Sequence, residues 1–194
     1  EKNLLNIDRI WYRDYCTFGK ISLLGSLLQL KEAKVKTSYT RIINIDLAEK
    51  VIWGNFRKSY RNLINQAAKK ITLRTLSHSN IKKTNIEKLF AFHTSVTGRQ
   101  TRSLNSWVEQ HKLVLSGKAV FIEAYADEKL VGFGFFLCFG RVLFYGSSAF
   151  LKMSAGASHA IIWAAIKYAK TKECRFFDIG EQVYRSCCTE PDLK

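Results

Sequence analysis

The stretch A-V-F-I-E-A-Y-A-D-E-K-L-V-G-F-G-F-F-L-C-F-G-R-V-L-F-Y-G-S-S, residues 119–148, decides the fold. It holds three runs that are rich in β-branched and aromatic residues, with short breaks at Asp127-Glu128 and Gly140-Arg141. Runs of this composition separated by short breaks are typical of neighbouring β-strands. The stretch therefore predicts three consecutive strands joined by tight turns.

Residues 154–172 predict a largely buried helix, because their apolar side chains cover most of a helical circumference. These side chains belong to Ala160, Ile161, Trp163, Ala164, Ile166, Tyr168 and Ala169. The run C-R-F-F-D-I-G at 174–180 is too short for a helix and predicts a strand parallel to an earlier one. Three strands, a helix and a strand make an α/β unit, and such units bind ligands at the carboxyl ends of their strands.

The segment from 46 to 70 predicts one long helix with an apolar stripe. Asp46 and Glu49 form a capping-box pattern at its start. The apolar positions recur every three or four residues, at Ile52, Phe56, Tyr60, Leu63 and Ala67. Before this segment, a short amphipathic helix is expected over 21–33 and a strand over 39–45.

The region between that long helix and the three strands predicts one strand, at 71–76, and two helices. Thr84 and Glu87 form a second capping box, for a helix that ends at Gly98. The other helix is expected over 104–115. The whole order then corresponds to an α/β (α+β) protein with a mixed sheet.

Length and composition bound the number of domains and the kind of partner. With 194 residues, of which 47% are hydrophobic, the chain can bury one good core, so we expect a single domain over 1–194. Within it, 1–38 is poorly assigned and 182–194 forms a polar tail. The chain starts at Glu1 rather than Met, so we expect a fragment of a longer protein.

The formal charge of +15 favours an anionic partner, which is nucleic acid, a phosphate-bearing substrate or an acidic membrane surface.

The cysteines and the hydropathy pattern argue against several classes of protein. The five cysteines are scattered, and none has C-x-x-C spacing. This arrangement argues against a zinc site and a disulfide framework and favours a reducing compartment. No apolar run approaches the ~18 residues that suggest a membrane-spanning helix. We therefore expect a protein of the cytoplasm or the inner membrane surface, without a metal site. The cysteines are Cys16, Cys138, Cys174, Cys187 and Cys188.

Basic residues dominate from 46 to 83, where nine lysines and arginines stand against two acidic residues. Lys50, Arg57 and Arg61 recur at intervals of seven and four, so they form a row beside the apolar stripe. Such a row is either a solvated helix face or a binding edge for phosphate. Its position against the buried stripe places it at the edge of a groove and favours the second interpretation.

Four motifs in order resemble the Fem-type, peptidoglycan-associated branch of the GNAT acyltransferase superfamily. They are F-R-K-S-Y-R-N-L-I-N-Q-A-A-K-K (56–70), H-T-S-V-T-G-R (93–99), A-D-E-K-L-V-G-F-G-F-F (126–136) and S-H-A-I-I-W-A-A-I-K-Y-A-K-T-K-E-C-R-F-F-D-I-G (158–180). The match covers about 39–181. The resemblance implies a GNAT-like mixed, splayed sheet flanked by helices, with an acyl donor entering between the separating strands.

The resemblance also implies an activity, which is transfer of an acyl or aminoacyl group to an amine. Several members of that branch take the group from aminoacyl-tRNA and deliver it to a peptidoglycan precursor. Two departures matter. The segment 153–158 lacks the leading basic or amide residue and the final small residue of the acetyl-CoA loop, which weakens coenzyme A as donor. The two-lobed Fem enzymes have a second such domain, for which this chain has no room.

Amide formation needs a bound donor, a hydrogen-bond donor for the developing oxyanion and an amine freed of its proton. Arg57, Lys58 and Arg61 suit phosphate, because helix spacing fixes guanidinium groups that bind phosphate in bidentate fashion. Arg99, in a loop after a helix, is a further candidate. Oxyanion stabilisation is expected from a backbone N–H near 145–148. These positions are Tyr145, Gly146, Ser147 and Ser148, with the Tyr145 hydroxyl as the alternative, although a strand tyrosine that only packs its ring and exposes its hydroxyl to water fits slightly better.

The candidates for the general base are His159, Asp178 and Glu181. His159 has an ordinary pKa near 6.5, which suits proton transfer at neutral pH, but a single histidine in a buried helix is often structural. Asp178 lies at the end of a strand, where it either acts on substrate or caps a loop. Glu181 follows Gly180 and fits a solvated position better. An enzyme that works mainly by positioning needs no dedicated base.

Three hypotheses follow. The first is an acyl- or aminoacyltransferase whose partners are a phosphate-bearing donor, aminoacyl-tRNA or acyl-CoA, and an amine acceptor such as a peptidoglycan precursor. The second is a non-catalytic module of the same fold that binds RNA or another anionic polymer. The third is a CoA-dependent N-acetyltransferase. The order of motifs ranks them in this sequence, and the oligomeric state stays open.

Overall fold

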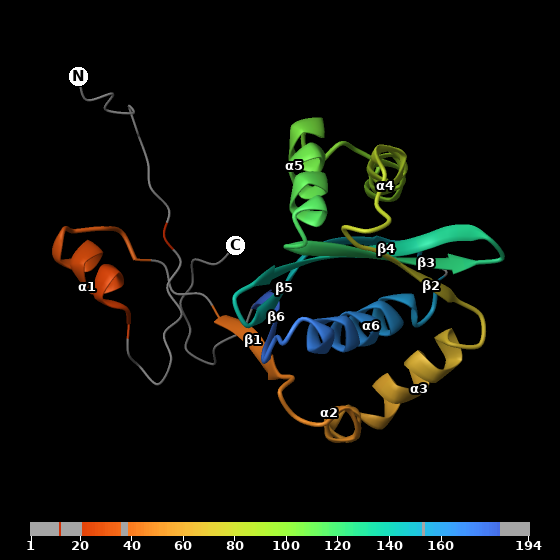
Figure 1. Cartoon of the computed structure of the whole chain (residues 1–194), viewed down its shortest axis with the longest axis horizontal. Coiled ribbons are helices and arrows are strands. Elements are labelled where there is room, and N and C mark those ends of the chain that lie inside the picture. The colour runs from red at the N-terminus through yellow and green to blue at the C-terminus, as the bar shows by residue number, and fades with distance from the viewer. Residues whose placement is uncertain (1–11, 13–20, 36–38, 153, 183–194) are drawn as a thin grey trace, which may run out of the picture. The chain divides into compact units, whose positions relative to one another are not determined.

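The computed structural model describes residues 12, 21–35, 39–152 and 154–182 (Figure 1). The chain divides into two compact units, residues 1–38 and 39–194. Except for Gln182, the tail expected at 182–194 lies outside the described residues, as do Cys16, Cys187 and Cys188. The expectation of a single domain over 1–194 stays a prediction.

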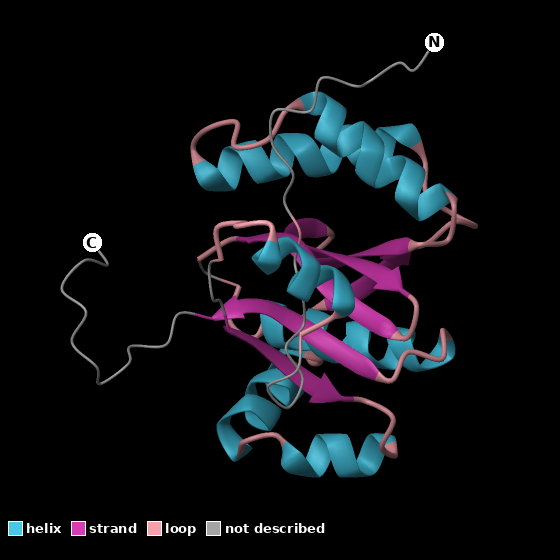
Figure 2. Cartoon of the chain, turned by 90° about the vertical axis from the view of Figure 1, so that its left-hand side faces the viewer, coloured by secondary structure: helices cyan, strands magenta, loops and turns pink. Residues whose placement is uncertain are grey.

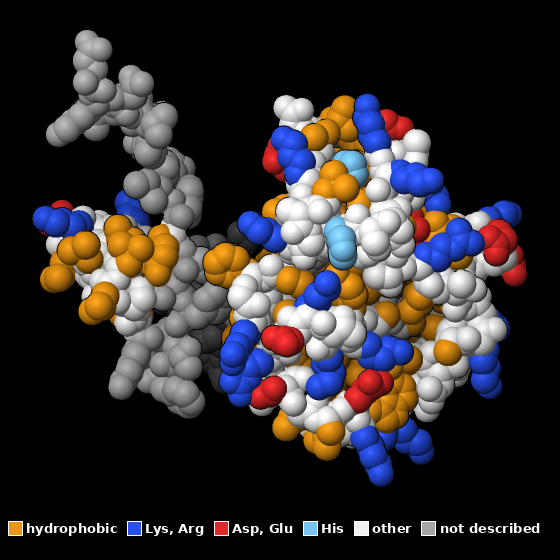
Figure 3. Space-filling view, viewed as in Figure 1, with side chains coloured by type: hydrophobic (Ala, Val, Ile, Leu, Met, Phe, Trp, Pro, Cys, Tyr) orange, Lys and Arg blue, Asp and Glu red, His pale blue; other side chains and the backbone are white. Residues whose placement is uncertain are grey.

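The first unit contains the short helix α1 (Leu23–Leu30), which confirms the helix expected over 21–33. Its N-terminus is capped by Ser22, whose Oγ accepts from the backbone N–H of Gly25 at 3.0 Å. None of its residues is buried, and Figure 3 shows hydrophobic side chains gathered on its surface.

The second unit is built on a six-stranded mixed sheet in the order β1-β6-β5-β4-β3-β2. Only β5 and β6 pair in parallel, and all other neighbours are antiparallel. The expected α/β class and the parallel last strand are thus confirmed. The strands are β1 (Tyr39–Asn44), β2 (Thr72–Leu76), β3 (Ala119–Ala126), β4 (Lys129–Phe139), β5 (Val142–Phe150) and β6 (Phe176–Gln182). The helices of this unit are α2 (Glu49–Asn55), α3 (Lys58–Ala67), α4 (Lys83–Thr97), α5 (Leu104–Leu115) and α6 (Ala157–Thr171).

The three consecutive strands β3, β4 and β5 form the predicted meander. The turn between β3 and β4 has positive φ at both central residues, Asp127 (φ 47°) and Glu128 (φ 60°). Two consecutive left-handed residues are the signature of the tight hairpin turn whose twist matches that of the flanking strands. The turn between β4 and β5 contains Gly140, with φ 55°.

The sheet carries a separate hydrophobic core on each face, because side chains of its strands alternate. In β3, Val120 and Ile122 pack with Ile161 of α6, whereas Phe121 packs with Leu89 of α4. Helices α2, α3 and α6 cover the first face, and α4 and α5 cover the second (Figures 1 and 2). Both surfaces of the central strands are therefore buried, which explains their near-continuous apolar runs.

The single long helix expected over 46–70 is wrong. Phe56 (φ −71°, ψ 142°) and Arg57 (φ −56°, ψ 146°) are extended, so the segment forms two helices, α2 and α3. The residues before the break include Gly54 and Asn55, both weak helix formers. The expected N-cap also fails, because the carboxylate of Asp46 binds Arg175 instead and α2 starts after Ala48.

The capping box expected at Thr84 and Glu87 is also wrong by two residues. Helix α4 begins at Lys83, and Asn85 Oδ1 accepts from the backbone N–H of Lys82 at 2.8 Å. The expected helix end is confirmed, since Gly98 adopts φ 70° after the last turn. The helix expected over 104–115 is confirmed as α5.

Helices α3 and α6 meet at Gly156, the N-cap residue of α6. Gly156 has φ +82°, and a Cβ built on it would lie 2.5 Å from the carbonyl oxygen of Leu63 and 3.1 Å from the Cβ of Ala67. A side chain at this position would therefore strain the backbone and push α3 away from α6. The close approach fixes where α3 lies over the start of α6.

We predict that Gly156→Ala lowers the free energy of unfolding by about 2 to 4 kcal/mol, because it combines an unfavourable φ with a clash against backbone. Gly54→Ala is the matched control, since nothing lies within 4 Å of a Cβ there and alanine favours a helix. Denaturant unfolding of both variants measures the effect. Equal stability of the two variants would contradict the close packing of α3 on α6.

Candidate active site

The candidate active site lies where β5 and β6 separate. These strands pair only from Val142 with Phe176 to Phe144 with Asp178. Beyond that point β5 continues beside β4 and β6 continues beside β1, and no further β5–β6 pair is found in the described part of the chain. The splayed sheet that the sequence resemblance implied is thus present. The separation exposes one backbone edge of β5 from Tyr145 onward.

A bulge marks the separation on each of the two strands. In β5, Tyr145 lies opposite Phe136 and Ser147 lies opposite Phe135, so Gly146 is an extra residue. In β6, Gly180 has φ +94° beside a register shift against β1. Bulges bend a strand and redirect its side chains, so the two bulges account for the opening of the sheet here.

Helix α6 begins beside this opening, because it follows β5 and leads into β6. Its N-cap is Gly156, which supplies no side-chain hydrogen bond. Backbone N–H groups at a helix N-terminus carry a partial positive charge and bind anions. The start of α6 can therefore receive a phosphate at the carboxyl end of β5.

Tyr60 of α3, Tyr145 of β5 and His159 of α6 meet at the opening. The rings of Tyr60 and His159 are 4.4 Å apart in an edge-to-face arrangement, and the Tyr145 hydroxyl lies 2.6 Å from Ser148 Oγ as donor. Burial, with Tyr145 nearby, raises the pKa of Tyr60 to about 12. Burial also raises the pKa of Tyr145. Both hydroxyls are therefore protonated at neutral pH and can donate hydrogen bonds.

His159 is the titratable group of this cluster that can accept a proton. It is the third residue of α6, and its Nδ1 lies 3.2 Å from Ser158 Oγ. Burial lowers the pKa of His159 below its ordinary value of 6.5. The imidazole is therefore neutral at pH 7 and available as a base.

An aromatic row continues from Tyr60 and His159 along α6. Adjacent ring centroids are 5.0 Å apart for Tyr60 and Phe56, 5.5 Å for Phe56 and Trp163, and 5.0 Å for Trp163 and Trp53. A hollow of about 400 Å³ borders the two tryptophans and is also lined by Glu49 and Lys50. Helical spacing puts Trp163 about 6 Å along α6 from His159. The row forms a stacking surface that leads to the opening of the sheet.

The predicted phosphate-binding residues Arg57, Lys58 and Arg61 lie at the start of α3. Arg57 is its N-cap and Lys58 and Arg61 are in its first turn, on either side of Tyr60 in the sequence, and Arg61 is half-buried. Within the described residues, no carboxylate forms an ion pair with any of the three. Their positive charges are thus available to an anion bound near Tyr60.

Asp178 is placed differently from His159. Its neighbours Phe177 and Ile179 belong to the core under α6, so alternation turns Asp178 to the opposite face. Its side chain is fully buried and accepts from Thr40 Oγ1 and from the backbone N–H of Gly180 at 2.8 Å. These bonds tie β1 to the bulge of β6, which favours the capping role that the sequence analysis kept open.

The remaining predicted residues lie apart from the cluster. Ser147 shares the parity of Ala149, so it faces α4, and its Oγ is buried without a hydrogen-bond partner in the described part of the chain. Arg99 is exposed in the loop after α4. Glu181 is exposed opposite Thr40 in β1. At the opening, Tyr145, Ser148 and His159 thus lie on the α6 face of the sheet, and Ser147 lies on the α4 face.

Several residues of the site were not singled out from the sequence. Tyr60 was assigned to an apolar stripe and Trp163 to a buried helix, Trp53 was not considered, and no local pattern distinguishes a core aromatic from one that lines a groove. His93 of α4 is buried against Trp107, and burial together with the nearby Arg102 lowers its pKa. The motif H-T-S-V-T-G-R contained His93, but only the fold places it on the α4 face of the sheet.

The described residues contain neither a candidate metal site nor a candidate membrane-spanning helix. No group of three or more His, Cys, Asp and Glu side chains that could hold a metal ion is found among them. No helix in the described ranges has the length and hydropathy required to span a membrane.

Solved structures with the same architecture are known. FemX superposes with a TM-score of 0.61 at 13% identity, over 78% of this chain and 55% of that chain. L-PGS from Bacillus licheniformis superposes with a TM-score of 0.63 at 15% identity, over 86% and 53% of the two chains. The C-terminal domain (DUF2156) of a putative lysylphosphatidylglycerol synthetase from Agrobacterium fabrum gives 0.52 at 8% identity, over 74% and 46%.

These likenesses show that the chain has a Fem/GNAT-type fold, as the sequence motifs implied. The identities are low, so the likeness establishes the fold alone. The chain spans about half the length of each of these structures. No family model matches the sequence, and a search of curated proteins found no similar sequence.

We predict that His159 sets the acidic limb of the pH–rate profile. Because burial lowers its pKa, the neutral base form is present above a midpoint that lies below pH 6.5, and the rate falls as the pH drops through that midpoint. His159→Asn should lower kcat/KM of acyl transfer by about 100-fold or more and remove this limb. His78→Asn, at an exposed turn, is the control. An unchanged limb in His159→Asn, or its loss only in Asp178→Asn, would refute the assignment.

Proposed function

We propose that this chain is an acyl- or aminoacyltransferase that moves an acyl group from a phosphate-bearing donor to an amine. The observation that supports the proposal is the opening between β5 and β6, where Tyr145 lies near Tyr60 and where Tyr60 contacts His159 of α6. Anion binding and a reacting centre are thereby brought together at the carboxyl ends of parallel strands. The fold shared with FemX and L-PGS is consistent with this chemistry.

The donor is held by its phosphate and by its planar groups. Its phosphate binds the N-terminus of α6 together with Arg57 and Arg61, whose guanidinium groups offer paired hydrogen bonds. A nucleobase stacks on the row that ends at Trp53 and Trp163, since aromatic rings bind any base through its π face. Both donors considered from the sequence, aminoacyl-tRNA and acyl-CoA, carry a nucleotide.

The reaction is attack of the acceptor amine on the acyl carbonyl. A C–N bond forms, and after collapse of the tetrahedral intermediate the C–O bond of an ester, or the C–S bond of a thioester, breaks. Backbone N–H groups of 145–148 that β6 leaves unpaired, or the Tyr145 hydroxyl, stabilise the oxyanion. His159 takes the proton from the attacking amine, and that proton passes to the leaving oxygen or sulfur.

The acceptor approaches from the α4 face, on which Ser147 lies. An amine of a cell-envelope precursor such as a peptidoglycan precursor is the proposed acceptor class, and Arg99 lies on this side for its negative groups. A lysylphosphatidylglycerol synthetase is named for an aminoacylated lipid, which makes envelope chemistry the consistent choice. The reaction then takes place in the cytoplasm or at the inner membrane surface.

A second candidate is a non-catalytic module that binds RNA or an anionic polymer. The formal charge of +15 and the unpaired cations of α3 favour it, because they would bind a polyanion without any reaction. A CoA-dependent N-acetyltransferase is the third, and the atypical loop at 153–158 speaks against it.

Transfer of a labelled acyl group tests the proposal. The purified chain is incubated with a mixture of labelled aminoacyl-tRNAs, or with labelled acetyl-CoA, and with a lysine-containing peptidoglycan precursor. We predict transfer from aminoacyl-tRNA, and a loss of at least about 100-fold in kcat/KM for Arg57→Glu/Arg61→Glu, because the donor phosphate loses two charge-assisted hydrogen-bond donors. The melting temperature should stay nearly unchanged.

The matched control is Lys69→Glu/Lys70→Glu, which reverses the same charge just beyond the far end of α3 and should leave transfer intact. If the arginine variant lost activity and stability equally, Arg57 and Arg61 would have a structural role and would not bind the donor. RNA binding that falls steeply with salt, without product from any donor, would instead establish the binding module. Transfer from acetyl-CoA alone would establish the N-acetyltransferase.

A further inference from the structure

The turn between β4 and β5 projects an aromatic side chain into solvent. Phe139 is 85% exposed, although phenylalanine buries most of its surface in a typical fold. It is followed by Gly140, with φ 55°, and by the exposed Arg141. Phe139 pairs with Val142 to close the hairpin, so the ring stands at a fixed position on a tight turn.

Basic residues from two other segments, at 118 and 172–175, lie near this turn. The backbone N–H of Cys138 donates to the carbonyl of Lys118 at 2.7 Å, and that of Arg175 donates to the carbonyl of Arg141 at 2.8 Å. Lys172 lies close enough to Cys138 to affect its titration, and burial next to Cys174 raises the pKa of Cys138 to about 12. Lys118, Arg141, Lys172 and Arg175 therefore share the end of the sheet that carries Phe139.

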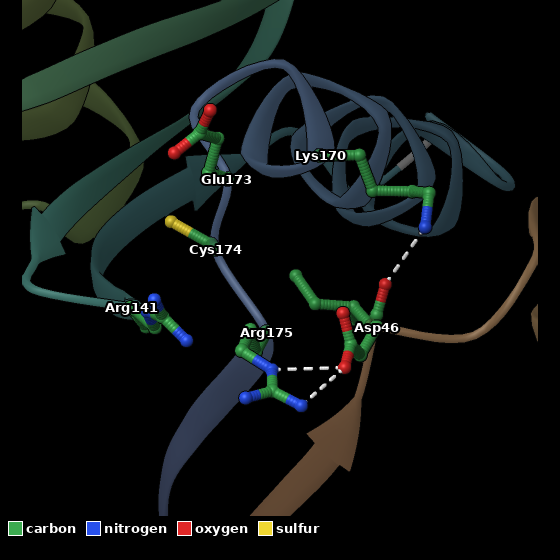
Figure 4. A pocket seen from close by; sticks show the side chains of 7 residues that line it. Asp46, Arg141, Lys170, Glu173, Cys174 and Arg175 are labelled. Carbon is green, nitrogen blue, oxygen red and sulfur yellow. Dashed lines mark hydrogen bonds and ion pairs between the residues drawn. The ribbon is translucent and has the colours of Figure 1, made fainter.

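Most of this charge has no carboxylate partner. Arg175 binds Asp46 Oδ2 at 2.6 and 2.8 Å, and Lys170 donates to the carbonyls of Ile45 and Leu47 (Figure 4). Within the described residues, Lys118, Arg141 and Lys172 form no ion pair. Two carboxylates, Asp46 and Glu173, thus stand against five cations.

A shallow hollow of about 450 Å³ opens beside the turn. It is lined by Ile45, Asp46, Arg141, Lys170, Glu173, Cys174 and Arg175. Figure 4 shows the side chains of Arg141 and Arg175 at the rim of the same hollow.

We propose that this end of the sheet docks on an anionic lipid surface, with Phe139 in the interface and Lys118, Arg141 and Lys172 on the lipid phosphates. Aromatic rings favour the boundary between headgroups and acyl chains. Lysine and arginine next to that boundary add attraction to anionic lipids. Insertion of the ring and attraction of the basic residues to anionic lipids are the two contributions that peripheral membrane binding requires.

The geometry favours a membrane over RNA. Proteins that hold single-stranded RNA stack several bases on aromatic side chains along a groove. Here the single exposed ring of Phe139 lies at a tight turn and is followed by Gly140 and Arg141. A projecting ring of this kind can enter a lipid interface without any rearrangement of the hairpin.

The proposed surface leaves the candidate active site open. Strand β5 starts at this turn and has nine residues, which extend over about 30 Å to the start of the loop that precedes α6. Docking through Phe139 would thus hold the chain at a membrane while the start of α6 stays accessible. The proposal does not depend on the transferase activity.

Sedimentation with lipid vesicles tests the docking surface. The whole chain is mixed with vesicles of phosphatidylcholine alone or with equal parts of phosphatidylglycerol, at low and high salt. We predict binding to the anionic vesicles that weakens at high salt, and little binding to phosphatidylcholine. Arg141→Glu and Phe139→Ser should each lower the partition coefficient at least about fivefold.

Two variants serve as matched controls. Lys129→Glu makes the same charge change at the β3–β4 turn, and Leu104→Ser removes an apolar side chain that is 52% exposed on α5. Both should bind vesicles as the parent chain does, and melting curves confirm that all four variants fold. Failure to bind anionic vesicles, or equal binding by test and control variants, would overturn the proposal. It would also be overturned if Arg141→Glu and Phe139→Ser weakened binding of a 20-nucleotide RNA while vesicle binding stayed the same.

Discussion

The separation of β5 from β6 is the constraint on which the candidate site depends. Two parallel strands stay paired for three residues and then diverge, because Gly146 adds a residue to β5 and Gly180 turns β6 with a positive φ. The carboxylate of Asp178 holds the second bend in place through Thr40 and Gly180. The opening is therefore built into the backbone. Beyond Phe144, β5 has no β6 partner in the described part of the chain, and acyl transfer needs hydrogen-bond donors of the kind that an unpaired strand edge supplies.

The second requirement is that α3 lies over this opening. The chain breaks between α2 and α3 at Phe56 and Arg57, and Gly156 lets the backbone of α3 approach the first residue of α6. As a result Tyr60 reaches His159, and Arg57 and Arg61, next to Tyr60 in the sequence, form no ion pair within the described residues. Burial then keeps the histidine neutral and the two tyrosines protonated. A proton acceptor and two hydrogen-bond donors thus meet next to an anion site.

The sequence alone predicted the sheet better than the site. The runs at 119–126, 129–139 and 142–150 became strands because composition and turn residues agreed, and the short run at 174–180 became the parallel strand. The break in the helix over 46–70 was missed, since its apolar spacing continues through Phe56. The sequence also could not separate the candidates for the general base, His159 and Asp178, which lie in different places. Strand alternation turns Asp178 away from α6, which carries His159, and the register at the two bulges is not predicted by any local pattern.

Hydrogen–deuterium exchange with a bound donor tests most directly whether the opening is the donor site. The chain is compared alone and with a non-reactive aminoacyl-RNA analogue that ends in adenosine, and with coenzyme A in parallel. The account predicts slowed exchange at the backbone amides of residues 145–148 and of the first turn of α6, with no change at the β3–β4 turn. Protection confined to other segments, with 145–148 and 157–160 exchanging as they do in the free chain, would contradict it.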